Sequence, residues 1–150
     1  MFKRQIQPYL LFSGRCEEAL EFYRSAIGAE VEFLMRYDQS PEPPQPGRLP
    51  PGFEHKVMHA SFRVGESRLM ASDGCDLDMN FSGFALSVAV GTEAEADQAF
   101  AALSEGGLVQ MPLCKTFWSP KFGMVTDKFG IGWMVTVRTE PPKSGPRTAG

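Results

Sequence analysis

The sequence has few cysteines and no cluster of basic residues, and both features exclude some classes of function. Cys16, Cys75 and Cys114 are widely spaced and odd in number, and no CxxC pair occurs. This pattern is typical of free thiols in a reducing cytoplasm rather than of a disulfide framework or a zinc cage. The lysines and arginines are scattered, and the formal net charge is -3. We therefore expect a cytoplasmic protein that does not bind nucleic acid.

The sequence also has no long apolar run. No stretch approaches the roughly 20 apolar residues that a membrane-spanning helix needs. The opening MFKRQIQPYLLF has a short apolar run and no small-residue cleavage site, so we expect neither a membrane partner nor a signal peptide. With 150 residues, 43% of them hydrophobic, the chain has enough apolar material for one domain or two fused modules. The expected partner is a small molecule or another protein.

The apolar spacing of the first half predicts the order β-α-β-β-β. The expected elements are a strand at 5–12, a helix at 15–27, and strands at 31–37, 55–64 and 67–73. Ser13 or Gly14 is expected to cap the helix. Six prolines lie between positions 41 and 51, and neither a helix nor a paired strand accommodates such a stretch. We therefore expect an exposed loop there.

The second half repeats the same order. The expected elements are a strand at 83–91, a helix at 93–105, and strands at 108–118, 122–127 and 132–137. Two βαβββ modules, at about 2–74 and 82–138, then make up one domain over residues 1–140. Residues 139–150 are polar and rich in proline and glycine, which predicts a flexible tail.

Several stretches add a more specific signal to this duplicated order. They are PYLLFSGRCEEALEFYRSAIGAE, HASFRVGESRLMASD, FSGFALSV and TFWSPKFGMVTDKFGIGWMV. In these stretches the chain resembles the vicinal oxygen chelate superfamily of glyoxalase I, extradiol dioxygenases and bleomycin-resistance proteins, and more closely its PhnB-like branch. The resemblance implies an α+β fold in which the two modules form a curled mixed sheet cup with helices on the outside. It also implies a homodimer, for which the aromatic residues Phe117, Trp118 and Phe122 suit the contact.

In the enzymes of this superfamily, the cup holds a divalent metal between ligands from four strands. The resemblance places these positions on Gln7, on Met70 or Ala71, on Gly83 or Phe84, and on Met134. Only Gln7 carries a donor group suited to a hard cation, because a thioether is a poor ligand for such ions. We therefore expect no metal. A methyltransferase label attaches to some relatives, yet no G-x-G loop follows the first strand to bind a nucleotide-like cofactor, and we expect no cofactor.

Strand alternation predicts which residues face the cup. On the strand at 55–64, Met58, Ala60, Phe62 and Val64 are expected against the helices, and His55, Val57, His59, Ser61 and Arg63 on the opposite face. On the last strand, Trp133, Val135 and Val137 are expected in the core, with Met134 in the cup. The expected ligand-binding lining is Gln7, Tyr9, His59, Arg63, Ser72, Ser87 and Met134.

Two of these lining residues have both a functional and a structural interpretation. His59 is a candidate hydrogen-bond donor or general base, although a lone strand histidine more often satisfies a structural partner. Arg63 suits a carboxylate or phosphate, although a solvated arginine at a strand end is commoner. His55 and His59 would lie about 13 Å apart along one strand, which is too far to share an ion.

Three function classes stay open, and the catalytic residues, if any, are unknown. The favoured class is a small-molecule binder that keeps the cup without the metal. The alternatives are a metal-assisted enzyme, lyase-like or dioxygenase-like, of unknown substrate, and an interaction protein with a vestigial cup. The sequence does not decide whether the protein is an enzyme.

Overall fold

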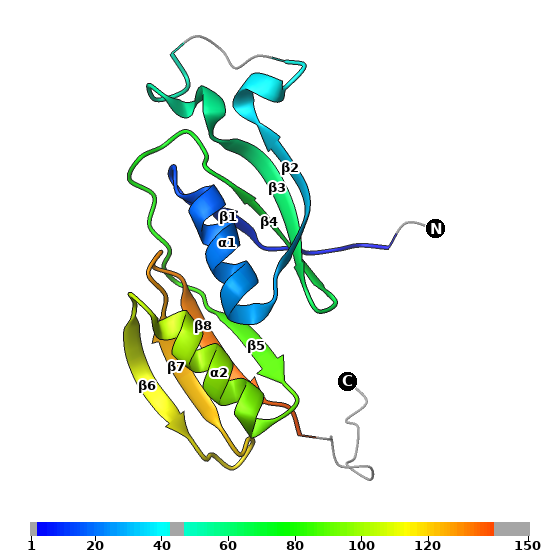
Figure 1. Cartoon of the computed structure of the whole chain (residues 1–150), viewed down its shortest axis with the longest axis vertical. Helices are drawn as coiled ribbons and strands as arrows, with labels where there is room; N and C mark the ends of the chain where they lie inside the picture. The colour runs from blue at the N-terminus through cyan, green and yellow to red at the C-terminus, as the bar shows by residue number, and fades with distance from the viewer. Residues whose placement is uncertain (1–2, 43–46, 140–150) are drawn as a thin grey trace. The chain divides into compact units, whose positions relative to one another are not determined.

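A computed structural model describes residues 3–42 and 47–139 of the chain. The chain divides into two compact units, Met1–Phe81 and Ser82–Gly150, and most of the predicted tail lies outside the described residues. The first unit contains β1 (Tyr9–Leu11), α1 (Cys16–Ile27), β2 (Glu30–Arg36), short 3-10 helices at Tyr37–Gln39 and Phe53–His55, β3 (Val57–Val64) and β4 (Ser67–Ser72). The second unit contains β5 (Leu86–Val90), α2 (Glu93–Ser104), β6 (Leu108–Cys114), β7 (Phe122–Thr126) and β8 (Gly132–Val137) (Figure 1).

Both units have the same topology. The strand order is β1-β4-β3-β2 in the first sheet and β5-β8-β7-β6 in the second. In each sheet the first strand of the unit runs parallel to the last, and the other pairs are antiparallel. The predicted α+β fold with two βαβββ modules is confirmed. The helix limits agree with the predicted ones to within one residue, whereas β1, β5 and β6 are shorter than expected.

In the first unit, α1 packs on one face of the sheet. The Tyr23 ring of the helix stacks on Phe62 of β3, with ring centroids 6.4 Å apart and an interplanar angle of 11°. Helix residues Ala19 and Leu20 are buried beside them. The predicted core positions on β3 are confirmed for Ala60 and Phe62, so the residues that alternate with them belong to the other face.

One face assignment on β3 was wrong. Val57 was expected to face the cup, but its side chain is fully buried. The cause is an irregularity in the ladder with β2, in which Met35 pairs with His59 and Arg36 pairs with Val57. The extra residue on β3 at this point shifts the side chains before it to the opposite face. Alternation read from sequence does not detect such a shift.

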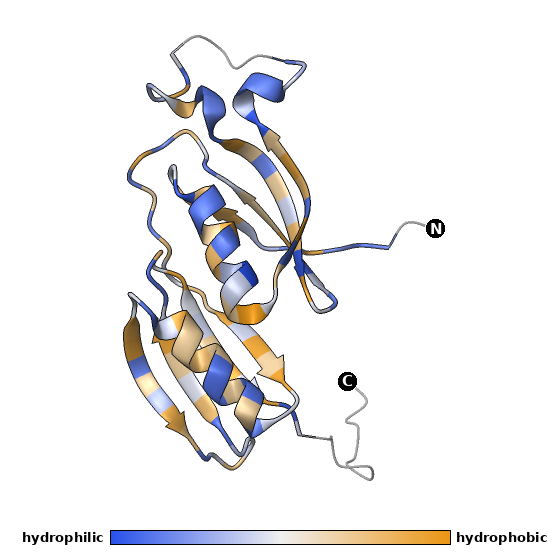
Figure 2. Cartoon of the chain, in the orientation of Figure 1, coloured by the Kyte–Doolittle hydropathy of each residue, from blue (hydrophilic) through white to orange (hydrophobic). Residues whose placement is uncertain are grey.

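In the second unit, α2 packs on its sheet through Phe100 and a glycine of β7. A Cβ atom on Gly123 would lie 2.7 Å from the Phe100 ring and 3.0 Å from the Met111 carbonyl oxygen. Glycine at this position therefore allows the helix and β6 to approach β7 closely. The predicted core residues of the last strand, Trp133, Val135 and Val137, are all buried. In Figure 2, β5 is drawn mostly in hydrophobic orange, whereas α1 carries several hydrophilic blue turns.

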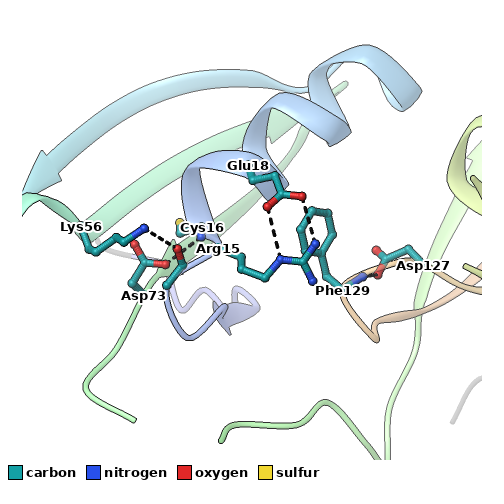
Figure 3. A network of polar contacts seen from close by, with 8 residues as sticks. Arg15, Cys16, Glu18, Lys56, Asp73, Asp127 and Phe129 are labelled. Atoms are coloured by element: carbon teal, nitrogen blue, oxygen red, sulfur yellow. Dashed lines mark hydrogen bonds and ion pairs between the residues drawn. The ribbon is translucent and has the colours of Figure 1, made fainter. Parts of the chain in front are cut away.

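The first unit is fastened at one end by a buried carboxylate that directly follows β4. Asp73 accepts a hydrogen bond from the backbone N–H of Cys16 at 2.7 Å (Figure 3). It accepts a second one from the backbone N–H of Val57 at 2.8 Å. The cap predicted at Ser13 or Gly14 was wrong, because the N-cap position is Arg15 and no side-chain cap bond forms there. An aspartate distant in sequence supplies the acceptor that a local cap would have supplied.

Replacement of Asp73 by alanine should destabilise the protein, because two buried N–H groups lose their acceptor. We expect the free energy of unfolding to fall by about 2–4 kcal/mol, measured by urea denaturation followed by circular dichroism. Asp78→Ala removes an exposed carboxylate from the same loop and should change stability by no more than about 0.5 kcal/mol. Equal stability of the Asp73→Ala and wild-type proteins would contradict this role.

Candidate functional site

The face of the first sheet opposite α1 carries a row of residues from all four strands. Cross-strand pairing joins Tyr9 to Met70, Met70 to Ser61, and Ser61 to Phe33. Directly paired residues project from the same face. We call this surface the first open face, and its residues are Tyr9, Phe33, Met35, His59, Ser61 and Met70. Tyr9 and Phe33 are each 47% exposed, so the face offers two aromatic rings to a binding partner.

Tyr9 and His59 meet on this face although they are 50 positions apart. The Tyr9 hydroxyl lies 2.9 Å from His59 Nδ1. The centroid of the His59 ring lies 5.5 Å from that of Tyr9 and 6.0 Å from that of Phe33. Burial raises the pKa of the Tyr9 phenol above its usual value, so the hydroxyl keeps its proton at neutral pH. Of the predicted lining residues in the first unit, Tyr9 and His59 are brought together, and the Ser72 hydroxyl lies close enough to the Tyr9 phenol to oppose part of this rise in pKa.

Arg63 and His55 have other partners. The Arg63 guanidinium pairs with Glu30, and its Nε lies 3.7 Å from the Glu32 carboxylate. His55 was expected on a strand beside His59, but it belongs to the 3-10 helix before β3, where its Nδ1 lies 2.8 Å from Asp38. The charge of Arg63 is therefore paired within the protein, which weakens the expectation that Arg63 binds an anionic ligand.

Two more predicted lining residues lie beside the first open face. Gln7 is half-buried and precedes β1. Ser72 is buried, and its hydroxyl accepts a hydrogen bond from Gly74 N–H at 2.9 Å. The Ser72 hydroxyl also lies 3.4 Å from the Val57 carbonyl oxygen. Ser72 is therefore engaged in the same β4 end that Asp73 fastens.

The second sheet carries an equivalent row with different chemistry. Met134 of β8 pairs with Ser87 of β5 and with Met124 of β7, and Met124 pairs with Met111 of β6. We call this surface the second open face, and its residues are Ser87, Met111, Cys114, Phe122, Met124, Met134 and Thr136. None of these side chains is a carboxylate, an imidazole, a lysine or an arginine. Methionine side chains are flexible and polarisable, and they adapt to irregular apolar partners.

Aromatic rings continue the second open face beyond the end of β6. Trp118 contacts Phe122 and Phe117 edge to face, with centroids 5.2 Å and 4.8 Å away. Trp118 is 47% exposed and Phe117 is 97% exposed. Apolar side chains gathered in this way on a surface mark a contact with a ligand or another protein.

A buried aspartate orders the turn that leads into β8. Asp127 Oδ1 accepts hydrogen bonds from the backbone N–H of Phe129 and Ile131 at 2.9 and 3.0 Å. Its Oδ2 accepts from the indole N–H of Trp133 at 2.8 Å. This one carboxylate holds the turn and the first core residue of β8, and so it fixes the register that places Met134 on the second open face.

The sequence reasoning missed several open-face residues. Phe33 and Met35 lie on a strand that was predicted, but alternation was not applied to it, and an irregularity between Val31 and Phe33 shifts its faces. Met111 lies beyond a similar irregularity after Val109. The repeated module could have indicated these residues. Residues at matching register positions in the two sheets lie at matching places on the two open faces.

The predicted metal-ligand positions carry few donor groups. Met70 and Met134 lie on the open faces and carry thioethers, whereas Ala71 is buried and Gly83 and Phe84 precede β5. Hard cations need several oxygen or imidazole ligands. Within residues 3–42 and 47–139, no group of three or more histidine, cysteine, aspartate or glutamate side chains could hold a metal ion.

Comparison with known proteins adds a family and a set of relatives. Residues 4–136 match the family described as 3-demethylubiquinone-9 3-methyltransferase. Protein YjdN from Escherichia coli is 32% identical over 143 residues, which cover 91% of this chain and 97% of that protein. The crystal structure of PA1353 from Pseudomonas aeruginosa has a TM-score of 0.79 and 41% identity, covering 92% of this chain and all of that one.

Two further solved structures bear on the resemblance stated from sequence. The putative 3-demethylubiquinone-9 3-methyltransferase, PhnB protein, from Bacillus cereus has a TM-score of 0.73 and 32% identity, over 90% of this chain and all of that one. The fosfomycin resistance protein FosX from Mesorhizobium loti is similar in fold, with a TM-score of 0.59, 11% identity and coverage of 93% and 95%. These matches support the PhnB-like branch and the glyoxalase-type fold.

No helix within the described residues is long and apolar enough to cross a membrane.

Replacement of Asp127 by alanine should weaken the second unit, because it removes the acceptor of three N–H donors. We expect a loss of about 2–4 kcal/mol in the free energy of unfolding, measured by urea denaturation followed by tryptophan fluorescence. The indole N–H proton resonance of Trp133 should also move. Asp97→Ala is the matched control, because its exposed ion pair with Lys121 is worth about 0–1 kcal/mol. A control that matched Asp127→Ala would refute this role.

Proposed function

The chain belongs to the 3-demethylubiquinone-9 3-methyltransferase family, and from that premise we propose that it binds a small apolar molecule without a metal ion. The observation that carries the proposal is that a methionine lies in the row of paired residues on each open face. It is Met70 on the first face and Met134 on the second. A thioether at these positions suits an apolar ligand better than a hard cation. On the first open face the proposed site uses the predicted lining residues Tyr9 and His59, and on the second open face it uses Met134.

The exposed rings of the first open face support ligand binding over a purely structural role. Tyr9 and Phe33 each keep about half of their surface in contact with solvent. Covering such surface is favourable by roughly 25 cal/mol per Å² of apolar area. His59 and Tyr9 add the few polar groups that orient a ligand on a mostly apolar surface. Arg63 contributes less, because two glutamates already engage it.

The family description names methyl transfer, but the start of α1 gives no support for a methyl-donor site. A nucleotide-like methyl donor is commonly held at a glycine-rich loop and a free helix N-terminus. Here the first N–H of α1, that of Cys16, is already bonded to Asp73 at 2.7 Å. The loop before it, Ser13-Gly14-Arg15, has no G-x-G pattern. The metal-assisted alternative has less support, since the described residues, 3–42 and 47–139, include no group of three or more histidine, cysteine, aspartate or glutamate side chains that could hold a metal ion.

We also propose a homodimer in which Phe117, Trp118 and Phe122 lie at the contact. The edge-to-face contacts among these rings form a continuous apolar cluster. Phe117 is almost entirely exposed, and burial of such rings against a second copy is a common source of dimer stability. Cysteines that are all free support a cytoplasmic location, where thiols stay reduced.

Metal analysis tests the first part of the proposal. Protein purified without added metal should contain substoichiometric Mn, Fe, Ni and Zn by plasma mass spectrometry, and EDTA should leave its melting temperature unchanged. Glyoxalase and dioxygenase activities should be undetectable. One equivalent of metal that survives dialysis, with loss of stability on chelation, would revive the metal-assisted enzyme.

Ligand binding tests the second part. After a thermal-shift screen identifies a ligand, His59→Ala should weaken its binding by about 1–3 kcal/mol, the usual effect of removing a partly buried hydrogen-bonding group. His55→Ala is the matched control, since it removes the other histidine of the chain, whose side chain is 81% exposed and pairs with Asp38. Equal losses in both variants, or no ligand from the screen, would count against the proposed site.

Light scattering during size-exclusion chromatography tests the dimer. The wild-type protein should elute with twice the chain mass at micromolar concentration. The double variant Phe117→Ser and Trp118→Ala should shift toward the monomer, because it removes the exposed rings of the cluster while leaving buried Trp133 in place. A wild-type monomer at this concentration would contradict the proposal.

A further inference from the structure

The Tyr9 and His59 pair carries more information than a general binding surface does. His59 Nδ1 is bonded to the Tyr9 hydroxyl at 2.9 Å. Among the described residues, no hydrogen-bond partner of His59 Nε2 occurs. One ring nitrogen is therefore satisfied within the protein, and the other is available to a ligand. The half-buried position of the imidazole between Tyr9 and Phe33 makes an unmade hydrogen bond there unfavourable.

The Tyr9 hydroxyl can select the tautomer of His59. Burial raises the pKa of the phenol, so the hydroxyl keeps the proton that it can donate across the 2.9 Å contact. When it donates to Nδ1, that nitrogen is the unprotonated acceptor, and the ring carries its proton on Nε2. In this tautomer the open group of His59 is an N–H donor.

The surroundings of this donor define the shape of its ligand. The rings of Tyr9 and Phe33 flank His59, with interplanar angles to the imidazole of 54° and 49°. Register pairs place Met70 beside Tyr9, and Met35 beside His59. Tilted aromatic rings and thioethers offer good contacts to the face and edge of another ring. The carboxylates on the same side of the sheet, Glu30 and Glu32, are paired with Arg63 and Arg68.

We propose that the first open face binds a planar aromatic compound through a carbonyl or carboxylate oxygen that accepts a hydrogen bond from His59 Nε2. Tyr9 is the positioning residue, since it fixes the tautomer of His59. This inference rests on the proposed function, and it adds the chemical class of the ligand. Recognition through a neutral donor also predicts that the oxygen is selected as an acceptor and not for its charge.

Three naphthalene compounds test the class of ligand by titration followed by NMR of the full chain. The probes are 1-naphthoate, its methyl ester and 1-methylnaphthalene, which present a charged acceptor, a neutral acceptor and no acceptor on the same ring. We expect the acid and the ester to bind with dissociation constants within about threefold of each other. 1-Methylnaphthalene should bind at least tenfold more weakly. Equal binding of 1-methylnaphthalene, or loss of binding by the ester alone, would overturn the inference.

Long-range proton–nitrogen correlation spectra test the tautomer directly, since the chain has two histidines. In the wild-type protein His59 should show the Nε2–H tautomer, and 1-naphthoate should shift that nitrogen. Tyr9→Phe should populate the other tautomer and weaken 1-naphthoate about tenfold. Tyr37→Phe, which removes a hydroxyl bonded to the Gly74 carbonyl, is the control and should bind as the wild type does. An Nδ1–H tautomer in the wild-type protein would refute the role of Tyr9.

The outcomes separate this inference from the proposed function. If no naphthalene probe binds but a screened ligand binds and depends on His59, the aromatic class is wrong and the proposed function stands. If no compound of any class binds, both are wrong. If 1-naphthoate binds but Tyr9→Phe and His59→Ala have no effect, the site lies elsewhere and this inference fails.

Discussion

The parallel pairing of the first and last strand of each module is the constraint on which the rest of the structure depends. It joins β1 to β4 and β5 to β8, and it closes the order β-α-β-β-β into a four-stranded sheet with one helix on one face. Parallel pairing requires a long connection, and the helix and hairpin supply it. The pairing sets the register that puts Tyr9 beside Met70 and Ser87 beside Met134.

Buried aspartates secure this arrangement at different places in the two units. Asp73 joins the ends of β3 and β4 to the start of α1, whereas Asp127 joins a turn to the indole of Trp133. Buried carboxylates persist when several N–H groups satisfy them. Both aspartates follow strands in the sequence, so an acidic residue at a strand end need not belong to a catalytic site.

The fold was predictable from the sequence because period-two and helical spacings are strong and the order of elements occurs twice. The core face of β8 followed from the same spacings. The candidate site was predictable only in part. Tyr9, His59 and Met134 lie on the open faces, but irregular pairings moved Val57 into the core and brought Phe33 and Met111 onto the open faces. A one-residue irregularity reverses every side chain beyond it, and nothing in the local sequence marks it. The cap predicted for α1 was wrong for another reason. The acceptor of the first helical N–H is Asp73, which is 57 positions from Cys16 in the sequence.

The two open faces have diverged from one another while the backbone has kept its register. The first carries aromatic rings and an imidazole, and the second carries three methionines and no carboxylate or imidazole. Direct binding of an organic ligand, without a metal ion, can be tested by the dissociation constant of one screened ligand. The constant would be measured by calorimetry on protein treated with EDTA and on protein supplied with excess Mn²⁺. We expect the same constant in both conditions, whereas binding that disappears with EDTA and returns with Mn²⁺ would show that a metal ion holds the ligand.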